Sequence, residues 1–98
     1  MTGPFDCIIE EQTDVVVLRV RGDIDILSSQ KLAERLLEAR RRFQKPLVVN
    51  LEQVTYFDSC GVKVLAEHSS IEPLTIVPSP IVRRVLNLVP LGDGVRVI

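Results

Sequence analysis

The tetrapeptide Asp-Ser-Cys-Gly at residues 58–61 is the stretch of this chain whose side chains are best suited to chemistry. It lies between an apolar run at 47–51 and an apolar helical pattern that begins at Val62, which predicts a turn at the entrance of a helix. Asp58 and Ser59 can accept hydrogen bonds from the free N–H groups of a first helical turn. Because the helix dipole favours negative charge there, a phosphate on Ser59 would occupy a position suited to anions.

The other two residues of the turn allow more than one interpretation. Gly61 lets the backbone approach another surface closely. Cys60 is expected to be a small buried hydrophobic residue, and the alternative is a reactive thiol whose pKa is lowered by the helix N-terminus. A thiol enzyme or a cysteine phosphocarrier would need a nearby base or a glycine-rich phosphate loop, and the sequence around Cys60 contains neither.

Composition excludes several classes of function. The chain has 98 residues, of which 46% are hydrophobic and 26% charged, with a net charge of −1, and this is typical of one globular domain spanning residues 1–98. The absence of a basic excess argues against nucleic-acid binding. Two cysteines and one histidine, His68, predict neither a disulfide framework nor a metal site. With no apolar run of about 20 residues and no signal peptide, we expect a cytoplasmic protein without membrane contact.

Hydrophobic periodicity predicts the elements that position the turn. Alternation at residues 15–21 indicates a strand, paired as a hairpin with a strand at 7–11 that places Cys7 in the core. Gly22 ends this strand, and a loop at 23–27 carries two carboxylates, Asp23 and Asp25. Ser28 is expected to cap the helix that follows. The later expected elements are a helix to residue 42, a strand at 47–51, a helix from the turn to about His68, a loop at 69–73, a strand at 74–77, a helix capped by Ser79 with Pro80 in its first position, and a strand at 95–98.

This order, β-β-α-β-α-β-α-β, predicts an α/β fold. Strands that alternate with helices form a mainly parallel sheet, here mixed because the N-terminal strand is antiparallel, with about three helices. His68, close to the end of its helix, is expected to be a cation at the helix C-terminus or a surface residue, and not a ligand.

Three blocks of the sequence resemble the STAS domain and, within it, the bacterial anti-sigma factor antagonists, also called anti-anti-sigma factors. They are Val17 to Asp25, the strand that leads into residues 58–61, and Pro78 to Leu86. The blocks occur in the family's order and at nearly its spacing, and together they cover nearly the whole chain.

The resemblance implies a partner-switching regulator of transcription without enzymatic activity or cofactor. Such a protein binds an anti-sigma factor that is also a serine kinase, and so frees a sigma factor. The kinase phosphorylates the serine after the aspartate, which corresponds to Ser59, and a phosphatase reverses the switch. The acid of the family's Gly-x-x-Asp loop corresponds to Asp25. The implied switch region comprises Asp23, Asp25, Asp58, Ser59, Cys60, Gly61 and Lys63.

The sequence departs from the family pattern in three places. Cys60 replaces a serine or threonine, Gly61-Val62-Lys63 replaces Gly-Leu-Gly, and the helix after the turn is expected to be short, with no helix after the last strand. The last two differences fall on the surface that such proteins offer to the kinase. The alternative within the family is a STAS scaffold or sensor, such as a component of a stress complex, that does not use Ser59. For Ser59 itself the alternative is a plain helix cap.

Overall fold

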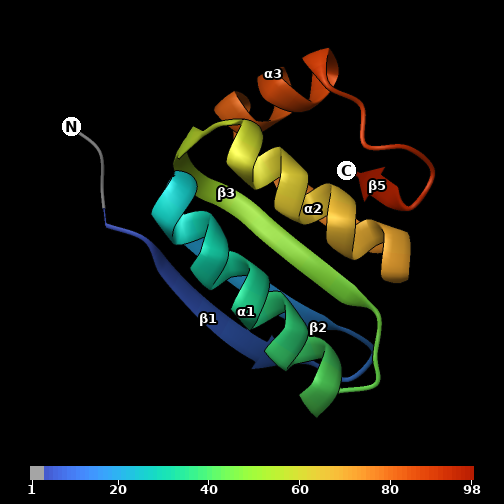
Figure 1. Cartoon of the computed structure of the whole chain (residues 1–98). Helices are drawn as coiled ribbons and strands as arrows, with labels where there is room; N and C mark the ends of the chain where they lie inside the picture. The colour runs from blue at the N-terminus through green and yellow to red at the C-terminus, as the bar shows by residue number, and fades with distance from the viewer. Residues whose placement is uncertain (1–3) are drawn as a thin grey trace.

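The computed structural model of the chain describes residues 4–98, which form a five-stranded mixed sheet and three helices (Figure 1). The elements are β1 (Asp6–Glu11), β2 (Val16–Ile24), α1 (Ile26–Arg42), β3 (Leu47–Phe57), α2 (Ser59–Ile71), β4 (Leu74–Pro78), α3 (Pro80–Leu88) and β5 (Val95–Val97). The strands are arranged in the order β1-β2-β3-β4-β5; β1 pairs antiparallel with β2, and all other pairs are parallel. The predicted fold class and element order are confirmed.

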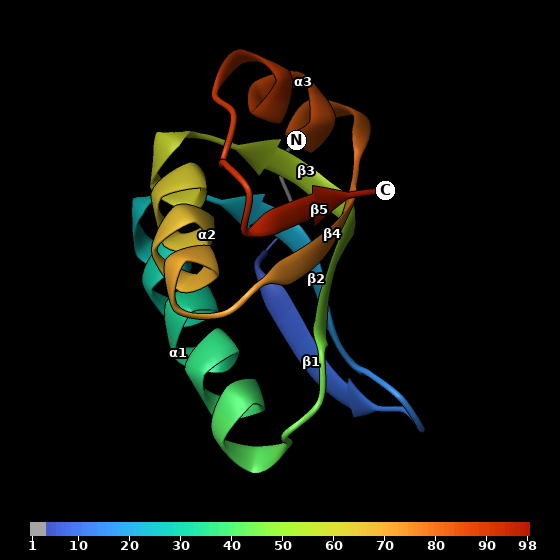
Figure 2. The same cartoon turned by 90° about the vertical axis from the view of Figure 1, so that its right-hand side faces the viewer.

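The parallel connections decide where the helices lie. Each strand-helix-strand crossover leads to the neighbouring strand, so α1 and α2 cover the same face of the sheet and lie side by side (Figures 1 and 2). The short helix α3 lies beyond the end at which β3 finishes (Figure 2). Both α1 and α2 therefore begin at the same end of the sheet, immediately after β2 and β3.

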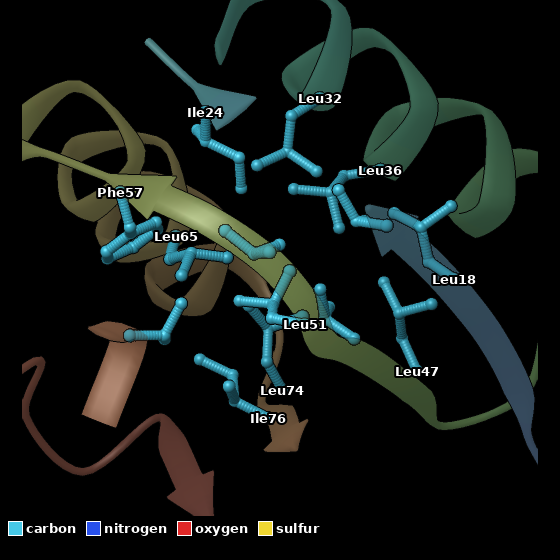
Figure 3. Packing of buried hydrophobic residues seen from close by; sticks show 14 of the residues in the cluster. Leu18, Ile24, Leu32, Leu36, Leu47, Leu51, Phe57, Leu65, Leu74 and Ile76 are labelled. Atoms are coloured by element: carbon cyan, nitrogen blue, oxygen red, sulfur yellow. The ribbon is translucent and has the colours of Figure 1, made fainter. Parts of the chain in front are cut away.

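Leucine and isoleucine side chains between the helices and the sheet form the core. Leu32 and Leu36 of α1 point toward the sheet, and Leu65 of α2 lies near Phe57 of β3 (Figure 3). These side chains are fully or almost fully buried, and each contributes about 1.5–3 kcal/mol through the removal of apolar surface from water. Within residues 4–98, no helix has both the length and the apolar character needed to cross a lipid bilayer.

Several element boundaries differ from the predicted ones. β2 continues through Gly22 to Ile24, so Asp23 belongs to a strand and not to a loop. Gly22 has φ of +90° and lies where the register between β2 and β3 is irregular. The strand nevertheless continues past Gly22, because Ile24 is completely buried and holds the chain on the sheet. β3 extends to Phe57 and α2 to Ile71, so the helix after the turn is longer than expected.

Two assignments of single residues are wrong. Asp25, not Ser28, is the N-cap of α1. His68 is buried, with only 6% of its surface exposed, because it lies on the face of α2 that turns away from solvent. The predicted cap of α3 is confirmed, with Ser79 as N-cap and Pro80 as the first helical residue.

Candidate functional site

The candidate site is the first turn of α2, which follows β3 without an intervening loop (Figure 1). Asp58 is the N-cap of this helix. Its carboxylate accepts a hydrogen bond from the Cys60 N–H at 2.9 Å, and its carbonyl accepts from the N–H of Gly61 at 3.1 Å and of Val62 at 3.2 Å. The alternative that made Ser59 the cap is therefore wrong, because Asp58 holds that position.

Ser59 is the first residue of α2, and its side chain is exposed. Within residues 4–98 no hydrogen bond to its hydroxyl is present, so the group is neither shielded nor engaged. A hydroxyl in this condition is free to meet an incoming reagent or partner.

Gly61 brings the turn close to the ends of two strands. A Cβ atom at this position would lie 2.5 Å from Cε1 of Phe57 and 3.0 Å from Cγ2 of Ile24. Distances this short leave no room for a side chain, so the prediction that glycine permits a close approach is confirmed. The contact fixes the start of α2 against β2 and β3.

Asp25 caps α1 as Asp58 caps α2. Its carboxylate accepts hydrogen bonds from the N–H of Ser28 at 2.9 Å and of Leu27 at 3.1 Å. The hydroxyl of Ser28 also donates to this carboxylate at 3.0 Å and accepts the Asp25 N–H at 2.8 Å, which completes a capping box. These bonds, with that from the Ser28 backbone foremost, lower the pKa of Asp25 and keep it ionised.

The two caps lie at neighbouring strand ends. Ile24, immediately before Asp25, pairs with Phe57, immediately before Asp58. The carboxylates of Asp58 and Asp25 both raise the pKa of the Cys60 thiol, which places both charges within electrostatic reach of the first turn of α2. The structure thus places Asp25 near Asp58, Ser59 and Cys60, all of which the family resemblance assigns to the switch region.

Asp23 and Lys63 lie at the edges of this group. Asp23 accepts a hydrogen bond from the hydroxyl of Thr55 at 3.0 Å, so it joins β2 to β3 beside the turn. Lys63 is exposed on α2, four residues after Ser59. Its charge opposes the acids by lowering the pKa of the Cys60 thiol.

Cys60 is half-buried, and its pKa is raised, first by burial and then by the charge of Asp58. Cys60 is therefore less buried than expected from the sequence. A thiol with a raised pKa is mostly protonated at neutral pH and is a poor nucleophile. The half-buried Cys7 has an even higher pKa, about 11, because of its burial against the core.

Sequence reasoning missed three exposed apolar side chains beside the turn. Ile26 and Leu27 occupy the first two positions of α1 with 66% and 71% of their surface exposed, and Tyr56 stands two residues before Asp58 with 43% exposed. The pKa of Tyr56 is raised, first by the charge of Asp58 and also by that of Asp25, which places it among the same acids. The available signal was the apolar pair directly after Asp25, which we assigned to a loop.

Comparisons with known proteins agree with this architecture. The family model described as the STAS domain matches residues 6–97. An anti-sigma factor antagonist from Mycobacterium paratuberculosis has a similar structure with a TM-score of 0.87 at 23% sequence identity, over 96% of this chain and 85% of that one. The anti-sigma factor antagonist SpoIIAA in its unphosphorylated form is similar with a TM-score of 0.72 at 22% identity, over 95% and 88% of the two chains. The Bacillus cell fate determinant SpoIIAA in the phosphorylated form is similar with a TM-score of 0.66 at 21% sequence identity, over 95% of this chain and 91% of that one. At these identities the likeness establishes a shared fold.

Proposed function

The chain belongs to the STAS domain family, and we propose that within this family it is an anti-sigma factor antagonist switched by phosphorylation of Ser59. Unphosphorylated, the protein binds an anti-sigma factor that is also a serine kinase, and a sigma factor is freed for transcription in the cytoplasm. Phosphorylation of Ser59 by that kinase releases the complex, and a phosphatase restores the starting state. The protein itself catalyses no reaction and needs no cofactor or small-molecule substrate.

The observation that carries this proposal is the state of the Ser59 hydroxyl. It is exposed and free of hydrogen bonds to residues 4–98, on a backbone fixed by the Asp58 cap and by the contact of Gly61 with Phe57. A kinase therefore meets a nucleophile that is held in place and requires no unfolding. A structural serine at a helix start would normally be engaged in capping.

The charge of a phosphate indicates whether phosphorylation strengthens or weakens binding of the partner. A phosphate adds about −1.5 to −2 charges at pH 7, next to the carboxylates of Asp58 and Asp25. A partner surface that fits the bare turn would have to bury this added charge without a group to pair with it, and burying an unpaired charge costs affinity. Phosphorylation is therefore expected to weaken binding.

The residues around Ser59 have different roles in this proposal. Asp58 and Gly61 hold the turn, Asp25 adds charge beside it, and Asp23 anchors the strand end through Thr55. The exposed pair Ile26 and Leu27 offers apolar contact area at the start of α1, at the same end of the sheet as the Ser59 turn. Apolar side chains surrounded by charged groups are a common composition for a transient protein interface.

The test is phosphorylation by the cognate kinase with ATP, followed by mass spectrometry to locate the modified residue. Ser59→Ala is expected to bind the kinase partner and to remain unmodified, whereas Ser59→Asp is expected to bind more weakly because it carries a permanent charge. Equal affinity of the two variants, with modification elsewhere or none, would remove Ser59 from the mechanism. The protein would then act as a STAS scaffold or sensor.

A further inference from the structure

Lys63 is a cation without a charged partner on the helix that carries Ser59. Its side chain is exposed, and in the described part of the chain the ion pairs join other residues: Arg19 to Glu10, Arg21 to Asp6, Arg35 and Arg42 to Glu38, Arg40 to Glu72, and Lys45 to Glu11. Lys63 also stands where the sequence departs from the glycine of the family pattern. Among residues 4–98, no ion pair and no cap of α2 uses its charge.

A phosphate on Ser59 would find little help from the backbone. The sequence suggests that the free N–H groups of the first turn would receive it, but the structure already engages two of them. The Cys60 N–H binds the Asp58 carboxylate, and the Gly61 N–H binds the Asp58 carbonyl. The nearest charged groups, Asp58 and Asp25, repel a phosphate, so its stabilisation at this turn depends on a cation.

Helix geometry brings Lys63 to that position. Residues four apart lie on the same face of a helix, and long side chains in the usual helical rotamers lean toward the helix N-terminus, so such a rotamer brings the ammonium group of Lys63 toward the turn that contains Ser59. An acid that precedes a lysine by four residues has the favourable orientation for an ion pair. The Lys63 charge already reaches this turn, because it acts on the Cys60 thiol against the two carboxylates.

We propose that Lys63 is the counter-ion of phosphorylated Ser59. This inference rests on the proposed modification of Ser59 and adds a second step to it. Before phosphorylation, the ammonium group of Lys63 is available to an acidic side chain of the partner. Afterwards, it pairs with the phosphate along the surface of α2. One modification thus adds negative charge and also withdraws a positive charge from the interface.

The experiment uses protein that carries phosphoserine at position 59, introduced during synthesis so that no kinase is needed. The second ionisation of the phosphate is followed by ³¹P NMR in the parent, in Lys63→Gln and in a matched control, Lys31→Gln, which removes an exposed lysine from α1. The phosphate's pKa is expected to be about 0.3 higher in Lys63→Gln than in the parent, as for an exposed i,i+4 pair. Lys31→Gln should leave it unchanged, and about 1 M salt should abolish the difference.

An equal phosphate pKa in the parent and in Lys63→Gln at low salt would overturn the inference. Equal changes of the phosphate pKa in the two lysine variants would also overturn it, because they would indicate an effect of the protein's net charge and not an ion pair between Lys63 and the phosphate. Since the phosphoserine is built in, failure of this pairing leaves the proposed switch untouched. Conversely, a kinase that ignores Ser59 would refute the proposed function without changing the titration.

Discussion

Replacement of Gly61 by alanine tests whether the turn is fixed by packing against the strand ends. The added methyl group would lie 2.5 Å from Cε1 and 2.8 Å from Cδ1 of the Phe57 ring, and 3.0 Å from Cγ2 of Ile24. Both neighbours are buried, Phe57 with 3% of its surface exposed and Ile24 with none, so neither can move into solvent to make room. The start of α2 must shift away from the sheet, or the ring must leave its preferred rotamer.

The expected cost follows from two opposing contributions. Forcing an extra methyl group into a packed core costs about 1–3 kcal/mol. Alanine is intrinsically better than glycine in a helix by up to about 1 kcal/mol. Gly61 is not among the glycines with positive φ, so the substitution adds no backbone strain. The net loss of unfolding free energy is therefore about 1–2 kcal/mol, which for a domain of this size lowers the melting temperature by about 4–8 °C per kcal/mol.

Urea unfolding of Gly61→Ala, Phe57→Leu and the double variant measures this loss and its cause. The smaller leucine makes room for the methyl group, so the double variant should lose less than the sum of the single losses, by at least about 0.5 kcal/mol. A Gly61→Ala protein as stable as the parent would refute the packing argument. Strictly additive losses would show that Phe57 is not the neighbour that matters.

Three further predictions concern titratable groups. Asp25→Asn keeps a capping side chain and should melt near the parent, whereas Asp25→Ala should melt lower. Because capping bonds lower the pKa of Asp25, its contribution is present above the ordinary pKa of an aspartate and is lost as pH falls through the lower folded pKa, so the gap between parent and Asp25→Ala in thermal melts should close in acid. Burial and then the charge of Arg40 lower the pKa of His68, so the unfolded chain takes up this proton at a higher pH than the folded chain. The parent should therefore lose stability to urea as the pH falls through the ordinary pKa of a histidine, about 6.5, and His68→Gln should lose less. The Cys60 thiol should react slowly with a labelling reagent at pH 7, and Cys60→Ser should preserve switching; fast labelling together with lost switching would make Cys60 the chemical centre.

Much of the fold follows from the sequence because each element carries its own periodicity. Arg19 and Arg21 alternate with the buried Leu18 and Val20 in β2, and Ser79 with Pro80 marks the start of α3 by the chemistry of helix entry. The order of the elements then leaves few topologies, since crossovers between parallel strands are right-handed and neighbouring. The family resemblance predicts that Asp25 lies beside the turn, and the pairing of Ile24 with Phe57 is the contact that produces this placement.

Other features depend on contacts between segments distant in sequence. Asp25 and Ser28 are both good cap residues, and the choice between them is made by the extended backbone at Asp25, which lets Ser28 serve as the reciprocal partner. Glycine commonly ends a strand, yet Gly22 does not, because the burial of Ile24 holds the chain on the sheet. The burial of His68 depends on how α2 is seated on the sheet, which a single helical pattern does not reveal.

The acidity of the candidate site is a consequence of how the fold is built. β2 and β3 are parallel neighbours, and each passes directly into a helix through an aspartate cap. The two carboxylates that cap α1 and α2 therefore lie at one end of the sheet, and the free hydroxyl of Ser59 stands beside them. Any phosphate placed on Ser59 meets the negative charge of these two caps. These two carboxylates are sufficient to repel a phosphate on Ser59, and no further acid is needed at the site. The exposed cation Lys63, four residues after Ser59 on α2, is not part of either cap, so its charge can change without loss of a cap.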